Sequence, residues 1–66
     1  MNIILNGKPR SVEDQQTVEQ LVTALELTNQ RIAIEVNQEL VPRSTFSSTT
    51  LSEGDEVEIV GAIGGG

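Results

Sequence analysis

The sequence has 66 residues, which is close to the lower size limit for a domain that folds around one hydrophobic core. It contains no cysteine and no histidine, which removes disulfides, thiol nucleophiles, the usual zinc ligands and the commonest neutral-pH general base. Ten acidic residues against four basic ones give a formal net charge of −6, which disfavours nucleic acids and anionic membranes and favours partners with basic patches. With no signal-like opening segment and no membrane-length apolar run, a cytoplasmic protein is expected.

The first elements expected are two short strands joined by a tight turn. An apolar run from Ile3 to Leu5 precedes Asn6-Gly7, a dipeptide typical of two-residue hairpin turns. A second strand is expected from Lys8 to about residue 12. Pro9 cannot donate a hydrogen bond within a sheet, so this second strand is predicted to lie at an edge.

A helix is predicted after a polar loop at residues 12–16. Thr17 and Gln20 match the capping-box pattern, in which each side chain accepts a hydrogen bond from the backbone of the other residue. Apolar residues then recur with the spacing of one helical face, and the helix is expected to end near residues 25–27. The residues of this face are Val18, Leu21, Val22 and Leu25.

The clearest strand covers residues 31–36, where apolar side chains alternate with period two. Those expected to face the helix are Ile32, Ile34 and Val36. Residues 37–39 are interpreted as a turn and residues 40–43 as a short strand, which Pro42 again places at an edge.

An irregular connection rich in serine and threonine is expected at residues 44–52, held by two apolar anchors, Phe46 and Leu51. The hydroxyl groups are interpreted as turn-forming, because no histidine or lysine base lies nearby in the sequence. A turn at residues 53–55 then leads into the last strand, from Glu56 to residue 60. In that strand Val57 and Ile59 are expected to point inward.

Two features at the end of the sequence are candidates for function. By alternation Ile4, Val60 and Ala62 are expected on the sheet face away from the helix, as either a docking patch or scattered apolar exposure. The glycines at 64–66 have no side chains to pack and maximal backbone freedom, so their one reactive group is the Gly66 carboxylate. Taken alone, the three glycines favour a frayed terminus or an engineered linker over a functional segment, and it is the rest of the chain that reverses this preference.

Together these elements predict an α+β domain in which one helix packs on one face of a mixed sheet of four to five strands. The prolines place the second and fourth strands at the edges, so the last strand can run parallel to the first at the centre. The domain is expected to cover residues 1–63, followed by a flexible glycine tail at 64–66. Its predicted core is Ile3, Leu5, Val18, Leu21, Val22, Leu25, Ile32, Ile34, Val36, Val57 and Ile59.

This arrangement resembles the β-grasp, or ubiquitin-like, fold, and the sequence is similar to the ThiS-type sulfur carriers of thiamine biosynthesis over essentially its whole length. The residues that carry the resemblance are Asn6-Gly7, Thr17-Val18, Val36-Asn37, Val41-Pro42-Arg43, Gly54-Asp55-Glu56-Val57-Glu58-Ile59-Val60 and Gly64-Gly65-Gly66. The segment beginning Gly54-Asp55 and the glycine end are typical of ubiquitin-like sulfur carriers in general. The Val-Pro-Arg segment and the short length favour the thiamine branch.

The resemblance implies a sulfur carrier that is a protein cosubstrate and not an enzyme. An adenylating, ThiF-like enzyme would use ATP and magnesium to activate Gly66, and a persulfide protein would supply the sulfur of a C-terminal thiocarboxylate. A ThiG-like thiazole synthase would then receive that sulfur. On this interpretation Gly64 and Gly65 let the tail thread into partners, the chain binds no cofactor or metal, and no residue of it is catalytic. The carrier is expected to be monomeric when free.

Two alternatives remain open at this point. One is the sulfur-carrier subunit of molybdopterin synthesis, which ends similarly but is usually longer and stays docked in its synthase. The other is a ubiquitin-like modifier or interaction domain, whose terminal glycine would form isopeptide bonds with lysine and never carry sulfur.

Overall fold

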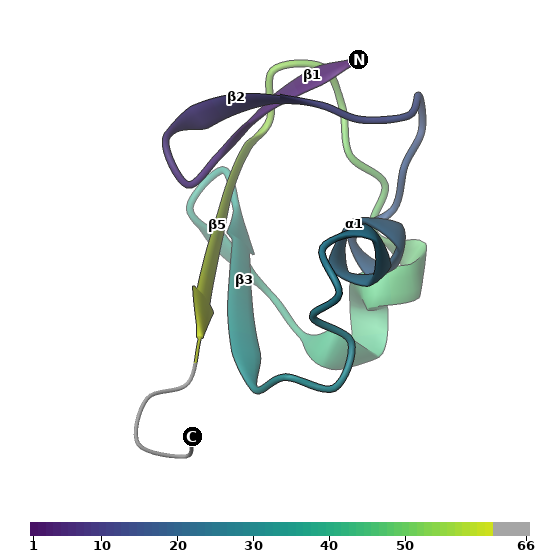
Figure 1. The fold of residues 1–66 in the computed structure, drawn as a ribbon, viewed down its shortest axis with the longest axis vertical. Helices are drawn as coiled ribbons and strands as arrows, with labels where there is room; N and C mark the ends of the chain where they lie inside the picture. The colour runs from purple at the N-terminus through teal and green to yellow at the C-terminus, as the bar shows by residue number, and fades with distance from the viewer. Residues whose placement is uncertain (62–66) are drawn as a thin grey trace.

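The computed structural model describes residues 1–61, which form a five-stranded mixed sheet with a single α-helix on one of its faces (Figure 1). This confirms the expected α+β architecture. The elements in chain order are β1 (Asn2–Leu5), β2 (Lys8–Ser11), α1 (Val18–Ala24), β3 (Ile32–Val36), β4 (Glu39–Val41), the 3-10 helix η1 (Arg43–Ser48) and β5 (Glu56–Gly61). In this part of the chain, no helix is both long and apolar enough to cross a membrane. The predicted tail at 64–66 lies outside the described residues, as does Ala62.

The strand order is β2-β1-β5-β3-β4, so the last strand of the chain lies at the centre of the sheet. β5 runs parallel to β1 and antiparallel to β3. The predicted strand at residues 40–43 is wrong in its second half: β4 ends at Val41, and Pro42 is the N-cap of η1, which begins at Arg43. Pro9 lies within the edge strand β2, as expected. Proline is tolerated there because the unpaired side of an edge strand needs no N–H donor.

Two-residue turns connect both hairpins of the sheet. Asn6 and Gly7 have φ angles of 50° and 84°, the left-handed values that such a turn requires, and they join the paired residues Leu5 and Lys8. The β3–β4 turn uses the same geometry, with φ angles of 52° at Asn37 and 70° at Gln38. This turn is one residue shorter than predicted, because Glu39 already pairs in β4.

The helix begins with the predicted capping box. The Thr17 hydroxyl accepts a hydrogen bond from the Gln20 N–H at 3.1 Å, and the Gln20 side chain accepts one from the Thr17 N–H at 2.9 Å. At the other end Glu26 has a φ of 61°, and the Leu27 N–H donates back to the carbonyl of Val22 at 3.0 Å. A seven-residue helix is too short to be stable alone, so its packing must hold it in place.

The core lies between α1, η1 and the inner face of the sheet. Its buried members are Ile3, Val18, Leu21, Val22, Ile34, Phe46, Leu51 and Val57. The other predicted core residues, Leu5, Leu25, Ile32, Val36 and Ile59, are partly buried and pack against these. The prediction underestimated the burial of Phe46 and Leu51, which are only 5% and 2% exposed and belong to the core itself.

The segment after Pro42 was predicted to be irregular, but its first part is the 3-10 helix η1. Hydroxyl groups stabilise it locally: Thr45 donates to the carbonyl of Pro42 at 3.0 Å, and Ser48 and Thr49 both donate to the carbonyl of Thr45. These short-range bonds agree with a turn-forming role for the hydroxyl-rich stretch. They also hold the segment that places Phe46 under α1.

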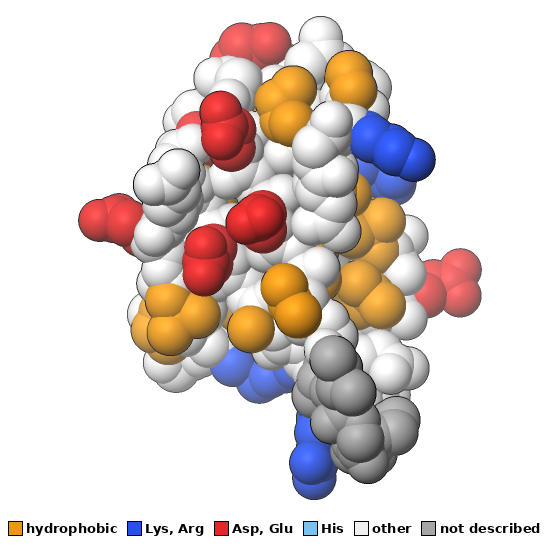
Figure 2. Space-filling model, turned by 90° about the vertical axis from the view of Figure 1, so that its left-hand side faces the viewer, with side chains coloured by type: hydrophobic (Ala, Val, Ile, Leu, Met, Phe, Trp, Pro, Cys, Tyr) orange, Lys and Arg blue, Asp and Glu red, His pale blue; other side chains and the backbone are white. Residues whose placement is uncertain are grey.

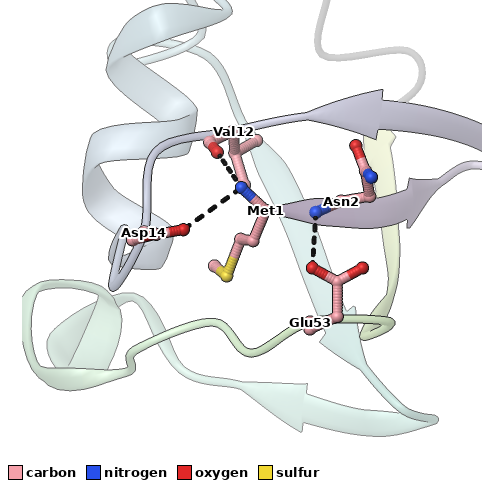
Figure 3. A network of polar contacts seen from close by, with 5 residues as sticks. All are labelled: Met1, Asn2, Val12, Asp14 and Glu53. Atoms are coloured by element: carbon pink, nitrogen blue, oxygen red, sulfur yellow. Dashed lines mark hydrogen bonds and ion pairs between the residues drawn. The ribbon is translucent and has the colours of Figure 1, made fainter.

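Polar contacts hold the start of β1, at the end of the molecule opposite to the end of β5 (Figures 1 and 3). The amino group of Met1 donates to the carbonyl of Val12 at 2.8 Å and to a carboxylate oxygen of Asp14 at 3.2 Å. The Asn2 N–H donates to the Glu53 carboxylate at 3.0 Å. Asp14 is largely exposed, so this ion pair contributes little to stability and serves mainly to order the loop after β2.

Candidate functional site

The candidate site is the end of β5, where the described part of the chain stops next to the predicted glycine tail. On one side β3 pairs with β5 as far as Gly61, whose partner is Ile32. On the other side β1 pairs only with the start of β5, at Glu56 and Val57. Gly61 is therefore held by backbone pairing with β3, while the flank of β5 that faces β1 lies open beyond the last β1 contact.

Two asparagine side chains hold β5 from its opposite sides. Asn6 continues the β1 side of the sheet, since its Oδ1 accepts from the Ile59 N–H at 2.8 Å and its Nδ2 donates to the Ile59 carbonyl at 3.3 Å. On the β3 side, Asn37 Oδ1 accepts from the Glu56 N–H at 3.0 Å. The hairpin turns thus tie the central strand in place, and they fix the point from which the following residues extend.

The outer face of the sheet carries two of the predicted docking residues, Ile4 and Val60, but it also carries charge (Figure 2). Val60 is 59% exposed and lies opposite Ala33. Ile4 is half-buried and pairs with Glu56, four positions earlier along β5, which is about 13 Å away at the usual strand rise. Glu58 lies between these positions on the same face.

The predicted patch is therefore not continuous across the described residues, because carboxylates separate Ile4 from Val60. A docking role for Ile4, Val60 and Ala62 stays a prediction. Sequence reasoning missed Leu40, which is 67% exposed and pairs with Glu35, itself opposite Glu58. Side chains alternate between the two faces of a strand, so an inward-facing Val41 would have predicted that its neighbour Leu40 faces outward.

Figure 2 shows basic side chains in two places, at the end of the molecule where β5 ends and at the upper right of the view, and carboxylates in the middle of the outer face. A cleft of about 420 Å³ beside Gly61 is lined by Arg31 and Arg43, together with Ile32, Ala33 and Val60. The carboxylates of the outer face are Glu35, Glu56 and Glu58.

Arg43 is fixed in this cleft by contacts with its own chain. Its guanidinium donates to the carbonyl of Gln30 at 2.8 Å and to that of Thr28 at 3.4 Å, and it lies 5.4 Å from the centre of the Phe46 ring. Arg43 thereby joins η1 to the loop that leads into β3.

Within residues 1–61, no cluster of three or more acidic side chains has the arrangement to hold a metal ion.

The functional residues predicted from the sequence divide into two groups. Ile4 and Val60 are placed on the outer face, as alternation predicted. Gly64, Gly65 and Gly66 lie outside the described residues. What the structure supplies is the anchored base of that segment: a central strand held on both sides, with a cationic cleft at its end.

Comparison with known proteins gives a consistent result. The model of the ThiS family matches residues 3–66. A crystal structure of the thiamine biosynthesis protein ThiS from Geobacter metallireducens superimposes with a TM-score of 0.86 at 36% identity, covering 100% of both chains.

Two curated relatives extend this likeness. The sulfur carrier protein ThiS of Bacillus subtilis is 32% identical over 63 residues, which is 94% of this chain and 96% of that protein. A thiazole synthase of Paramagnetospirillum magneticum is 38% identical over 66 residues, covering 100% of this chain. The chain spans 20% of the length of that synthase.

Proposed function

The chain belongs to the ThiS family, and on that premise we propose that it is a sulfur carrier whose Gly66 carboxylate becomes a thiocarboxylate for thiazole formation in thiamine biosynthesis. The observation that carries this proposal is the extent of the family match, which runs through the three glycines at 64–66. The likeness to nearly the whole of a sulfur carrier from Bacillus subtilis supports the same role.

The proposed chemistry begins with activation, because a carboxylate is a poor electrophile. In a ThiF-like enzyme that supplies the magnesium site, a Gly66 oxygen attacks the α-phosphorus of ATP and pyrophosphate leaves. The terminal sulfur of a persulfide protein then attacks the acyl carbon of the adenylate, and AMP leaves. A second thiol reduces the resulting acyl disulfide, so that the sulfur–sulfur bond breaks, the thiocarboxylate is released and a new disulfide forms on the donor side.

The structure supports this role through the position of β5. A strand held on both sides gives the five residues after Gly61 a fixed starting point, and these residues extend at most about 16 to 18 Å. That length is enough to enter a buried nucleotide site. Ordering such a segment costs roughly 1 to 2 kcal/mol of backbone entropy per residue, which keeps affinity moderate and lets the carrier leave one partner for the next.

The second partner in this proposal is a ThiG-like thiazole synthase. The support is the likeness of the whole chain to one fifth of thiazole synthases from two organisms, at 38% and 39% identity. A carrier-like segment within a synthase chain suits the transfer of sulfur from the carrier to the synthase, because a single chain then holds both groups close together.

Intact-mass measurement tests the proposed function. The protein is incubated with ATP, Mg²⁺, an adenylating enzyme and a persulfide sulfur source, and its mass is expected to rise by one exchange of oxygen for sulfur. Peptide mapping should place the change at residue 66. A modifier would instead give conjugates to lysine without sulfur, and an unchanged mass with an enzyme that is active on its own carrier would contradict the proposal.

Val60→Glu is expected to raise the KM for adenylation about tenfold while leaving the fold intact. Val60 is exposed on the outer face, and a carboxylate there would interrupt an apolar contact and add to the charge of Glu58. Pyrophosphate exchange measures the KM. Ser47→Glu on η1 makes the same change of charge on the helix side and should behave as wild type. An unchanged KM for Val60→Glu would make the patch ordinary surface.

A further inference from the structure

The cleft at the end of β5 concentrates positive charge in an acidic chain. Arg31 and Arg43 are two of only four basic residues, yet both line this one cleft beside Gly61, and no acidic side chain of residues 1–61 lines it. The one ion pair within residues 1–61 joins Met1 and Asp14, at the opposite end of the molecule, and involves neither arginine. Neither guanidinium group therefore forms an ion pair with a carboxylate of residues 1–61.

The Arg43 guanidinium is also held ready for a ligand. Its two backbone acceptors, the carbonyls of Thr28 and Gln30, are neutral, and the Phe46 ring under it is buried. Two of its five N–H donors make these bonds, which leaves others for a further acceptor. Because its position is fixed in advance, binding an anion there costs little side-chain entropy.

The distance to the reacting carboxylate decides which anion this is. With a fully extended tail, Gly66 would lie about 16 to 18 Å beyond Gly61, which would place the phosphate of an adenylate beyond the reach of Arg31 and Arg43. A group that contacts the cleft while Gly66 reacts must instead belong to the protein surface around the entrance. Guanidinium groups bind carboxylates in paired hydrogen bonds, so acidic side chains are the matching chemistry.

We propose that the cleft of Arg31 and Arg43 binds carboxylate side chains at the entrance of the channel in the adenylating enzyme that receives the glycine tail. This rests on the proposed function. The outer face has the opposite charge, carried by Glu35, Glu56 and Glu58. A partner that is acidic at the entrance and basic beside it accepts the carrier in one orientation, with the tail directed inward.

Arg31→Glu compared with Arg10→Glu tests this proposal. Each replaces one positive by one negative charge and changes the formal net charge from −6 to −8, but Arg10 is an exposed residue of the edge strand β2 and does not line the cleft. Arg31→Glu should weaken binding to the adenylating enzyme about tenfold or more at low salt, with the difference shrinking as salt rises. Arg10→Glu should stay within about twofold of wild type. Arg31→Lys keeps the charge but loses the paired hydrogen bonds, so its affinity should lie between those of wild type and Arg31→Glu. Arg31 is the residue chosen for substitution, because replacing Arg43 would also break its hydrogen bonds to the carbonyls of Thr28 and Gln30.

Binding is measured directly by calorimetry without ATP, and sulfur loading is measured separately by intact mass at saturating enzyme. Equal affinities for the two glutamate variants would overturn the proposal, even with wild type fully loaded. Unimpaired binding with a lower loading rate for Arg31→Glu would also overturn it, because the arginine would then act at the reacting atoms. Changes in the NMR amide shifts of residues 31–33 on adding ATP or inorganic phosphate alone would also overturn the proposal. Failure of the wild type to gain sulfur while it binds would count against the proposed function instead.

Discussion

Removal of Gly66, or extension of the chain beyond it, is expected to lower the rate of sulfur loading on the order of 100-fold or more. The reason is positional: either change displaces the carboxylate from the attacking geometry, and errors near 1 Å already cost about that factor. Loading is followed by intact mass in single-turnover reactions. The base of the segment is fixed by pairing of Gly61 with Ile32, so such a displacement is not relieved by a shift of β5.

Gly65→Val belongs to the same prediction, because a branched side chain would obstruct a channel shaped for glycine and would restrict φ. Gly61→Ala is a control for the fold: a Cβ built at Gly61 meets no atom of residues 1–61 within 4 Å, so the fold should accept it. Thermal denaturation of all variants should match wild type. A chain extended past Gly66, shown to be unprocessed, that still gains sulfur at the normal rate would place the site elsewhere.

Leu21→Ala is expected to lower the free energy of unfolding by about 2 to 5 kcal/mol. Leu21 is fully buried on α1, and its removal would leave a cavity between the helix and the sheet. A domain of this size has a total stability of only roughly 3 to 10 kcal/mol, so the variant should be partly unfolded at moderate temperature.

Reversible urea denaturation measures this loss. Thr23→Ala changes an exposed residue of the same helix and should stay within about 0.5 kcal/mol of wild type. A cost for Leu21→Ala as small as that of the control would mean that the helix does not hold the core together.

Local patterns in the sequence predicted most of the secondary structure correctly. The Asn6-Gly7 turn, the Thr17–Gln20 capping box and the alternation in β3 depend on residues close together in the chain. The edge positions of β2 and β4 were also predicted, from Pro9 within β2 and from Pro42, which lies directly after β4. The boundaries were off by one to three residues, because tertiary contacts decide where strand pairing and helical turns stop.

The burial of Phe46 and Leu51 was harder to predict. Each stands alone among hydroxyl-bearing residues, so neither belongs to a periodic pattern. Phe46 is buried because η1 packs on α1, a contact between segments distant in the chain. Leu51 is held by its N–H bond to the carbonyl of Gln16, beside the bridge between Thr17 and Thr50. Long-range packing of this kind leaves no signal in the spacing of nearby residues.

Some features of the candidate site likewise follow from local sequence, and others follow only from the tertiary structure. The sequence by itself determined the glycine segment, its terminal carboxylate and the outward direction of Ile4 and Val60, because these depend on residue type and on strand alternation. Only the tertiary structure decided that carboxylates separate Ile4 from Val60, since that follows from the register between β1 and β5. It alone brought Arg31 and Arg43, twelve positions apart, to one cleft beside Gly61, because the hydrogen bonds of Arg43 to Thr28 and Gln30 draw η1 against the start of β3.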